Sequence, residues 1–186
     1  MSAPLLEPDL AGRVIERALA RGGDFAELFC EESRTFGVSI DESRVERPQS
    51  GAERGAGVRV LDGETAYFAH VDGLGEDDLL RAADAAAAAL HGERTQPQPL
   101  AALAESAPQE IEHAPGEVAA ERKAELLRAA DELAREQGEA IDQVSASYAE
   151  GRRRVAIFNS DGTSAADERT RVRFGAQVVA KRNATV

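Results

Sequence analysis

The sequence predicts an α+β fold, in which three helices flank one antiparallel or mixed β-sheet. Apolar residues recur at helical spacing in three separated segments, and they alternate at a period of two between and after those segments. Turns rich in glycine, asparagine and aspartate divide the alternating stretches. Strands grouped between helices in this way are typical of a sheet that helices cover on one face.

The first helix is expected over residues 10–21, where one face is apolar. Asp9 is the expected N-cap, and the glycines at 22 and 23 are expected to end the helix. From residue 25 the period changes to two and predicts two successive strands. Their apolar faces are Ala26, Leu28 and Cys30 in the first strand, and Phe36, Val38 and Ile40 in the second.

A hairpin is expected next, with strands over residues 55–61 and 65–71 joined by a turn at Asp62-Gly63. Acidic residues at 76–78 then favour the start of a second helix, and Gly92 ends it. Its expected buried residues are Leu79, Leu80, Ala83, Ala87 and Leu90. Residues 92–116 contain several prolines and little periodicity, so we expect an irregular linker that can hold one short strand.

The third helix is expected over residues 117–137, and further strands follow it. Its expected inward residues are Leu126, Leu127, Ala130, Leu133 and Ala134. The next strand has Val144, Ala146 and Tyr148 on one face, and a turn at Gly151 separates it from a strand with Val155 and Ile157. A turn at residues 159–163 precedes the last strand, whose apolar residues are Val172, Phe174, Ala176 and Val178.

These elements form a weak helix-strand-strand-strand repeat within a single domain, residues 1–186. The two sub-repeats span about 9–91 and 117–186, and the linker spans about 92–116. In each half, a late strand carries an arginine between branched or aromatic residues, Arg59 in the first and Arg173 in the second. We therefore expect the topology to repeat, although few residues are identical.

Composition limits the classes of partner. The chain is 42% hydrophobic and 30% charged, as in folded globular proteins. Its net charge of -12 repels nucleic acid and anionic membrane surfaces, so we expect neither as a partner. The single cysteine, Cys30, excludes an intrachain disulfide, and residues 1–10 lack the pattern of a secretory signal. We expect a cytoplasmic protein.

Basic residues gather at the end of the chain. Residues 151–186 carry a net charge of +5, whereas residues 1–150 carry -17. The basic residues are Arg152, Arg153, Arg154, Arg169, Arg171, Arg173, Lys181 and Arg182. One interpretation is a solvated strand face opposite acidic helices; the other is a surface that meets an acidic peptide or another subunit.

Arg59 and Arg173 are the candidate binding residues, because each is the charged member of an otherwise apolar strand triplet. Each can be a simple exposed or ion-paired arginine. Alternatively, both line a groove that holds the carbonyls or carboxylate of an extended peptide.

The sequence offers no local catalytic constellation. His70, His91 and His113 are about twenty residues apart, so no two share a helix turn as in zinc peptidase motifs. Cys30 is expected to be a buried structural thiol. No G-x-S-x-G motif occurs, and Gly55-x-Gly57 lacks the third glycine of a dinucleotide fingerprint. We expect no catalytic or metal-binding residue in this chain.

Four segments together resemble the N-terminal half of the TldD/PmbA metallopeptidase family, also named modulators of DNA gyrase. They are Gly23-Asp24-Phe25-Ala26-Glu27-Leu28, Gly55-Ala56-Gly57-Val58-Arg59-Val60 followed by Phe68-Ala69, Arg122-Lys123-Ala124-Glu125-Leu126-Leu127, and Asp161-Gly162-Thr163-Ser164-Ala165-Ala166-Asp167. Their order and spacing agree with the family along nearly the whole chain. The last segment is more similar to the TldD branch than to the PmbA (TldE) branch.

The resemblance implies a peptidase whose subunits pair as homo- or heterodimers and whose zinc cleaves small or unfolded peptides. In that family an H-E-x-x-x-H motif and a later cysteine in the C-terminal catalytic domain hold the metal. This sequence has no such motif, and Cys30 lies in the wrong region. We therefore expect a non-catalytic N-terminal domain that contributes chamber walls and subunit contacts and is inactive alone.

The strand pattern continues to Val179, close to the last residue, which predicts a truncated chain from which the catalytic domain is absent. The alternative is a stand-alone binding or adaptor protein that has the fold without the peptidase activity. An unrelated α+β enzyme with a dispersed active site is a third possibility.

Overall fold

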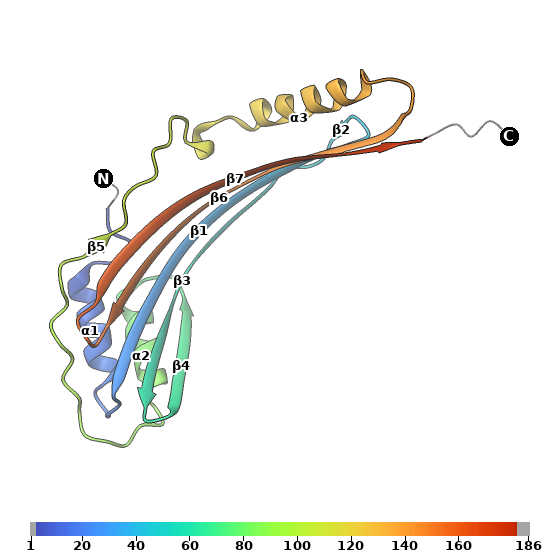
Figure 1. Cartoon of the computed structure of the whole chain (residues 1–186). Helices are drawn as coiled ribbons and strands as arrows, with labels where there is room; N and C mark the ends of the chain where they lie inside the picture. Colours follow the sequence, from blue (N-terminus) through green and yellow to red (C-terminus); the bar gives the residue numbers. More distant parts are fainter. Residues whose placement is uncertain (1–2, 182–186) are drawn as a thin grey trace. The chain divides into compact units, whose positions relative to one another are not determined.

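The computed structural model describes residues 3–181 and confirms the α+β class (Figure 1). The helices are α1 (Pro8–Ala18), α2 (Glu76–Ala86) and α3 (Ala120–Arg135), with a 3-10 turn η1 (Pro115–Glu117). The strands are β1 (Phe25–Asp41), β2 (Arg44–Val45), β3 (Gln49–Asp62), β4 (Thr65–Asp72), β5 (Ala104–Glu105), β6 (Ile141–Asn159) and β7 (Ser164–Ala180).

All the strands described belong to one mixed sheet. Its order is β4-β3-β1-β6-β7-β5, and β2 pairs with β1 outside this path. The β3–β4 and β1–β2 pairs are antiparallel. Strand β5, which lies in the predicted irregular linker, runs parallel to β7 and pairs with it over two residues. The topology does not confirm the predicted internal repeat.

The chain forms two compact units that share strands. Unit 1 contains residues 1–33, 53–108 and 153–169, and unit 2 contains residues 34–52, 109–152 and 170–186. Strands β1, β3, β6 and β7 each contribute residues to both units.

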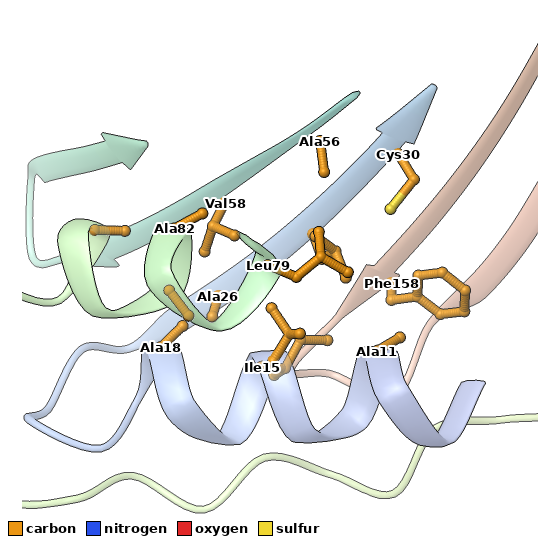
Figure 2. Packing of buried hydrophobic residues seen from close by; sticks show 14 of the residues in the cluster. Ala11, Ile15, Ala18, Ala26, Cys30, Ala56, Val58, Leu79, Ala82 and Phe158 are labelled. Carbon is orange, nitrogen blue, oxygen red and sulfur yellow. The ribbon is translucent and has the colours of Figure 1, made fainter. Parts of the chain in front are cut away.

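The core of unit 1 lies between the helices α1 and α2 and one face of the strands (Figure 2). Helix α1 buries Ala11, Val14, Ile15 and Ala18, and helix α2 buries Leu79, Ala82, Ala83 and Ala86. The strands contribute alternate residues, namely Ala26, Leu28, Cys30, Ala56, Val58, Val60, Ala156 and Phe158. Because the period-two residues of β1 and β3 all face these helices, the hydrophobic effect fixes the strand faces here.

The turns of unit 1 correct two local predictions. Helix α1 begins at Pro8, whose fixed φ suits the first turn, so Asp9 lies inside that turn and the N-cap is Glu7. The helix ends at Ala18 with Leu19 as its C-cap, earlier than expected, and Gly22 and Gly23 follow it with positive φ. In the hairpin, Asp62 still pairs with Thr65, so the turn is Gly63-Glu64 with φ +55° at Gly63, one residue later than predicted.

Two predicted strand breaks are wrong. Residues 25–41 form one strand instead of two, because the polar stretch 31–35 has no glycine, proline, asparagine or aspartate to turn the chain and stays extended. No turn occurs at Gly151, and β6 runs through it without a positive φ. The face of β6 therefore continues from Tyr148 to the buried Ala156 and Phe158, and Val155 and Ile157, the residues named for the predicted separate strand, are only half-buried.

Unit 2 has a smaller core, which contains Val38, Ile40, Leu127, Ala146 and Tyr148. The predicted buried face of α3 is wrong at two of its five positions, because Leu126 and Leu133 are 50% and 61% exposed; Leu127 is buried as predicted, and Ala130 and Ala134 are half-buried. Helix α3 instead buries Lys123, Ala124, Leu127 and Asp131. The spacing of apolar residues misled the prediction because α3 turns two ionisable side chains toward the protein.

Candidate functional site

Arg59 lies on β3 in unit 1, next to an exposed aromatic residue. Its guanidinium is 3.1 Å from the Glu27 carboxylate on β1 and remains 46% exposed. Across the β3–β4 ladder Arg59 faces Phe68, which is 65% exposed and stacks on His70 with ring centroids 6.2 Å apart. This part of the sheet therefore presents a cation and two aromatic rings to solvent.

The glycine at position 57 makes this arrangement possible. A Cβ added to Gly57 would lie 2.9 Å from the Phe68 ring, so the ring covers the glycine backbone. A side chain of the neighbouring strand thus makes a close approach to the backbone at Gly57.

The basic residues of the last strands are largely ion-paired in unit 1. Arg153 donates to Glu31 at 2.6 Å, and this hydrogen bond raises the pKa of the guanidinium. Arg169 lies 2.5 Å from Asp167, whose pKa is lowered mainly by a hydrogen bond from the Ser106 hydroxyl and further by Arg169. Of these residues, Arg153, Asp167 and Arg169 line a shallow cavity of about 160 Å³ together with Phe29 and Val155. Local carboxylates therefore neutralise much of this charge.

Arg173 lies on β7 in unit 2, so it belongs to a different unit from Arg59. It is exposed, in a stretch where Val172, Phe174, Val178 and Val179 are 39% to 51% exposed. Beyond the short β5 ladder, no described strand pairs with the outer edge of β7. The last strand therefore offers an apolar surface, an open edge and arginines. Arg182 lies outside the described residues.

A buried charged cluster in unit 2 was not predicted. The Lys123 ammonium is 2.8 Å from the Glu150 carboxylate, and Tyr148 donates a hydrogen bond to the same carboxylate at 2.6 Å. The ammonium also lies 4.5 Å from the centre of the Phe36 ring. Burial, and then the Glu150 carboxylate, raise the pKa of Tyr148. The sequence did not indicate this cluster, because a lysine in an amphipathic helix does not by itself predict a buried ion pair.

Cys30 is fully buried, as predicted for a structural thiol. Burial raises its pKa to about 12, and the charge of Arg54 acts in the opposite direction. The three histidines do not come together with other ligands: among residues 3–181 no group of three His, Cys, Asp or Glu side chains could hold a metal ion. In the same residues, no helix is long and apolar enough to cross a membrane.

Two models of one protein family match most of the chain. The PmbA/TldA metallopeptidase domain 1 matches residues 26–90, and the PmbA/TldA metallopeptidase central domain matches residues 113–186. The metalloprotease TldD homolog of Haemophilus influenzae is 30% identical over 172 residues, which is 88% of this chain and 34% of that protein.

The chain belongs to the TldD/PmbA metallopeptidase family. It spans about a third of the length of the curated TldD homologue it matches. The matches do not separate the TldD branch from the PmbA branch.

Solved structures share the fold. TldE from Thermococcus kodakarensis has a TM-score of 0.71 at 17% identity, over 94% of this chain and 40% of that one. A putative modulator of DNA gyrase from Bacteroides thetaiotaomicron has a TM-score of 0.72 at 17% identity, over 95% of this chain and 41% of that one.

The matched family models describe metallopeptidases, so a metal ion is the cofactor that the family implies. The described residues of this chain do not fit a zinc ion, because they bring together no suitable set of ligands. Metal-dependent chemistry is therefore not assigned to any residue between 3 and 181.

Proposed function

We propose that this chain is the N-terminal, non-catalytic domain of a TldD-like zinc metallopeptidase that processes small or unfolded peptides in the cytoplasm. The observation that supports the proposal is the match to domain 1 and the central domain of the family, in a chain whose described residues supply no metal site. In this proposal the zinc is bound in a separate C-terminal catalytic domain, and residues 1–186 form one functional domain.

In the proposal, this domain contributes walls of the peptide chamber and subunit contacts. The exposed surface of β7 supports this role, because an unpaired edge with apolar side chains is a ready site for another strand. The partners are the catalytic domain, a TldD/PmbA-family subunit in a homo- or heterodimer, and peptide substrates. The Asp-Gly-Thr segment favours the TldD branch.

A zinc and hydrolysis measurement tests the non-catalytic role. The purified chain should contain no stoichiometric zinc by mass spectrometry and should leave an unstructured peptide intact. Stoichiometric zinc together with hydrolysis would refute the proposal. A reading frame that continues to an H-E-x-x-x-H motif supports the domain role, whereas a native stop codon directly after this chain favours the adaptor alternative.

Arg59 and Arg173 are the proposed peptide-binding residues. Their test is the binding of a fluorescent unstructured peptide, measured by anisotropy with the Arg59→Gln and Arg173→Gln variants. We expect each to weaken binding severalfold. Arg13→Gln is the matched control, because Arg13 is also about half exposed and paired with a glutamate, at 2.9 Å. Equal effects of all three substitutions would contradict the assignment.

A further inference from the structure

Helix α3 is attached to unit 2 mainly by polar contacts. Of its four buried residues, Lys123 and Asp131 are ionisable, Ala124 is small, and Leu127 is the one large apolar side chain. By contrast, α1 buries four apolar residues and no charged one. The apolar area that α3 removes from water is therefore small, and the hydrophobic effect holds this helix less firmly than α1.

The first polar contact joins three elements. Lys123 comes from α3, Glu150 and Tyr148 from β6, and Phe36 from β1. The ammonium is 5% exposed and the carboxylate 10%, so both charges are removed from water and depend on each other. The Phe36 and Tyr148 rings, with centres 4.5 and 5.5 Å from the ammonium, add a cation–π contribution that an uncharged side chain cannot replace. We call this group the Lys123 cluster.

The second polar contact lies two turns further along α3. The Asp131 carboxylate, 5% exposed, accepts a hydrogen bond of 2.6 Å from the Ser43 hydroxyl and one of 3.1 Å from Arg135. Ser43 lies in the turn between β1 and β2, where it has a positive φ of 64°. One hydrogen bond thus joins this part of the helix to a turn of unit 2.

We propose that α3 is a displaceable cover of unit 2. The helix moves away from the strands as one piece before the rest of the protein unfolds. The Lys123 cluster is its latch, meaning the contact that keeps the helix in place. A buried ion pair contributes little net stability when complete, but the loss of one partner leaves the other charge buried and unpaired. The attachment of α3 can therefore be removed by one change while the core of unit 1 stays intact. Opening would expose the strip that α3 covers, which includes Val38, Ile40, Ala146 and Tyr148.

Hydrogen exchange measured by mass spectrometry tests the proposal without any variant. In the unmodified chain, α3 amides should exchange through an opening that depends less on denaturant than global unfolding does, because it exposes only the smaller core of unit 2. The amides of α1 should exchange only through an opening with the denaturant dependence of global unfolding. If α3 and α1 share one free energy and one denaturant dependence, the proposal is wrong.

Substitutions then test the latch. Lys123→Met keeps the length of the side chain and removes its charge, and we expect α3 exchange to become at least tenfold faster while α1 exchange stays unchanged. Adding Glu150→Gln should recover part of the protection, because no unpaired carboxylate remains buried. Arg122→Met is the matched control: it breaks the exposed Arg122–Glu125 pair on the same helix and should change exchange less than twofold.

Two outcomes of the variant series would overturn the latch. One is unchanged α3 exchange in Lys123→Met; the other is an equal acceleration in α3 and α1, which would mean that the residue supports the whole fold.

Discussion

The burial of Cys30 predicts how much stability the fold loses as the pH rises. The thiol is fully buried in the core of unit 1, and desolvation raises its pKa to about 12. An unfolded cysteine has a pKa of about 8.5. Above that pH the unfolded chain loses the thiol proton while the folded chain keeps it, so the stability of the fold falls as pH rises from about 8.5 toward 12.

The expected size at pH 10 is about 2 kcal/mol. The unfolded thiol is then about 1.5 pH units above its pKa, and each unit corresponds to about 1.4 kcal/mol. We expect urea denaturation of the wild-type chain to show this loss between pH 7.5 and pH 10. The Cys30→Ala variant, which has no thiol to titrate, should lack it. Other groups titrate in both proteins and cancel in the difference.

An alkylation measurement is the independent check. At pH 8 a thiol with a pKa of about 12 is ionised about a thousandfold less than a free cysteine, so native alkylation should be slower by at least that factor. Equal pH slopes for wild type and Cys30→Ala, or rapid alkylation of the native chain, would refute the reasoning about burial.

Three further predictions concern stability and are measured by urea denaturation. Gly55→Ala should destabilise the fold by about 1–3 kcal/mol, because the new Cβ would lie 2.7 Å from the Val71 carbonyl oxygen. Gly57→Ala should lower the free energy of unfolding by less, because its new Cβ would contact the exposed Phe68 ring, which can move. Phe158→Ala should lower the free energy of unfolding by about 3–5 kcal/mol, and Ile157→Ala should lower it clearly less. A larger loss for Ile157→Ala would contradict the observed buried face of β6. Arg59→Ala should cost less than about 1 kcal/mol because its pair with Glu27 is solvent-exposed, and a larger loss would mean that Arg59 has a structural role.

The sequence was most informative in unit 1, where each helix and strand buries one face. Alternation identified Ala26, Leu28 and Cys30, and the helical spacing of α1 and α2 identified their buried faces, because in unit 1 apolar packing alone decides these positions. The turn at residues 159–163 was also predictable, since Asn159 accepts hydrogen bonds from two backbone amides and Gly162 has a positive φ.

The sequence was least informative in unit 2. The face of α3 was predicted from its leucines, but the Lys123 cluster and Asp131 determine which face is buried. Such a pairing joins residues far apart in the chain, and helical periodicity carries no information about it. The long strands were divided in two for a related reason: glycine and polar residues can end a strand, but neighbouring strands on both sides keep β1 and β6 extended.

The candidate site was only partly accessible from the sequence. Arg59 and Arg173 stood out by their triplets, but the sequence could not indicate that Glu27 binds Arg59 or that Phe68 lies over Gly57. Both are cross-strand contacts that depend on strand order and register.

The shared strands constrain how this chain can fold during synthesis. Unit 1 is completed by residues 153–169, which include Ala156 and Phe158 of its core. Until the ribosome has released that segment, β1 lacks its β6 neighbour and the first core remains incomplete. The nascent chain therefore exposes the unpaired edge of β1 while some 150 residues are already made, the situation in which chaperones protect unfinished sheets. For the same reason, no continuous fragment of this sequence contains one unit without part of the other.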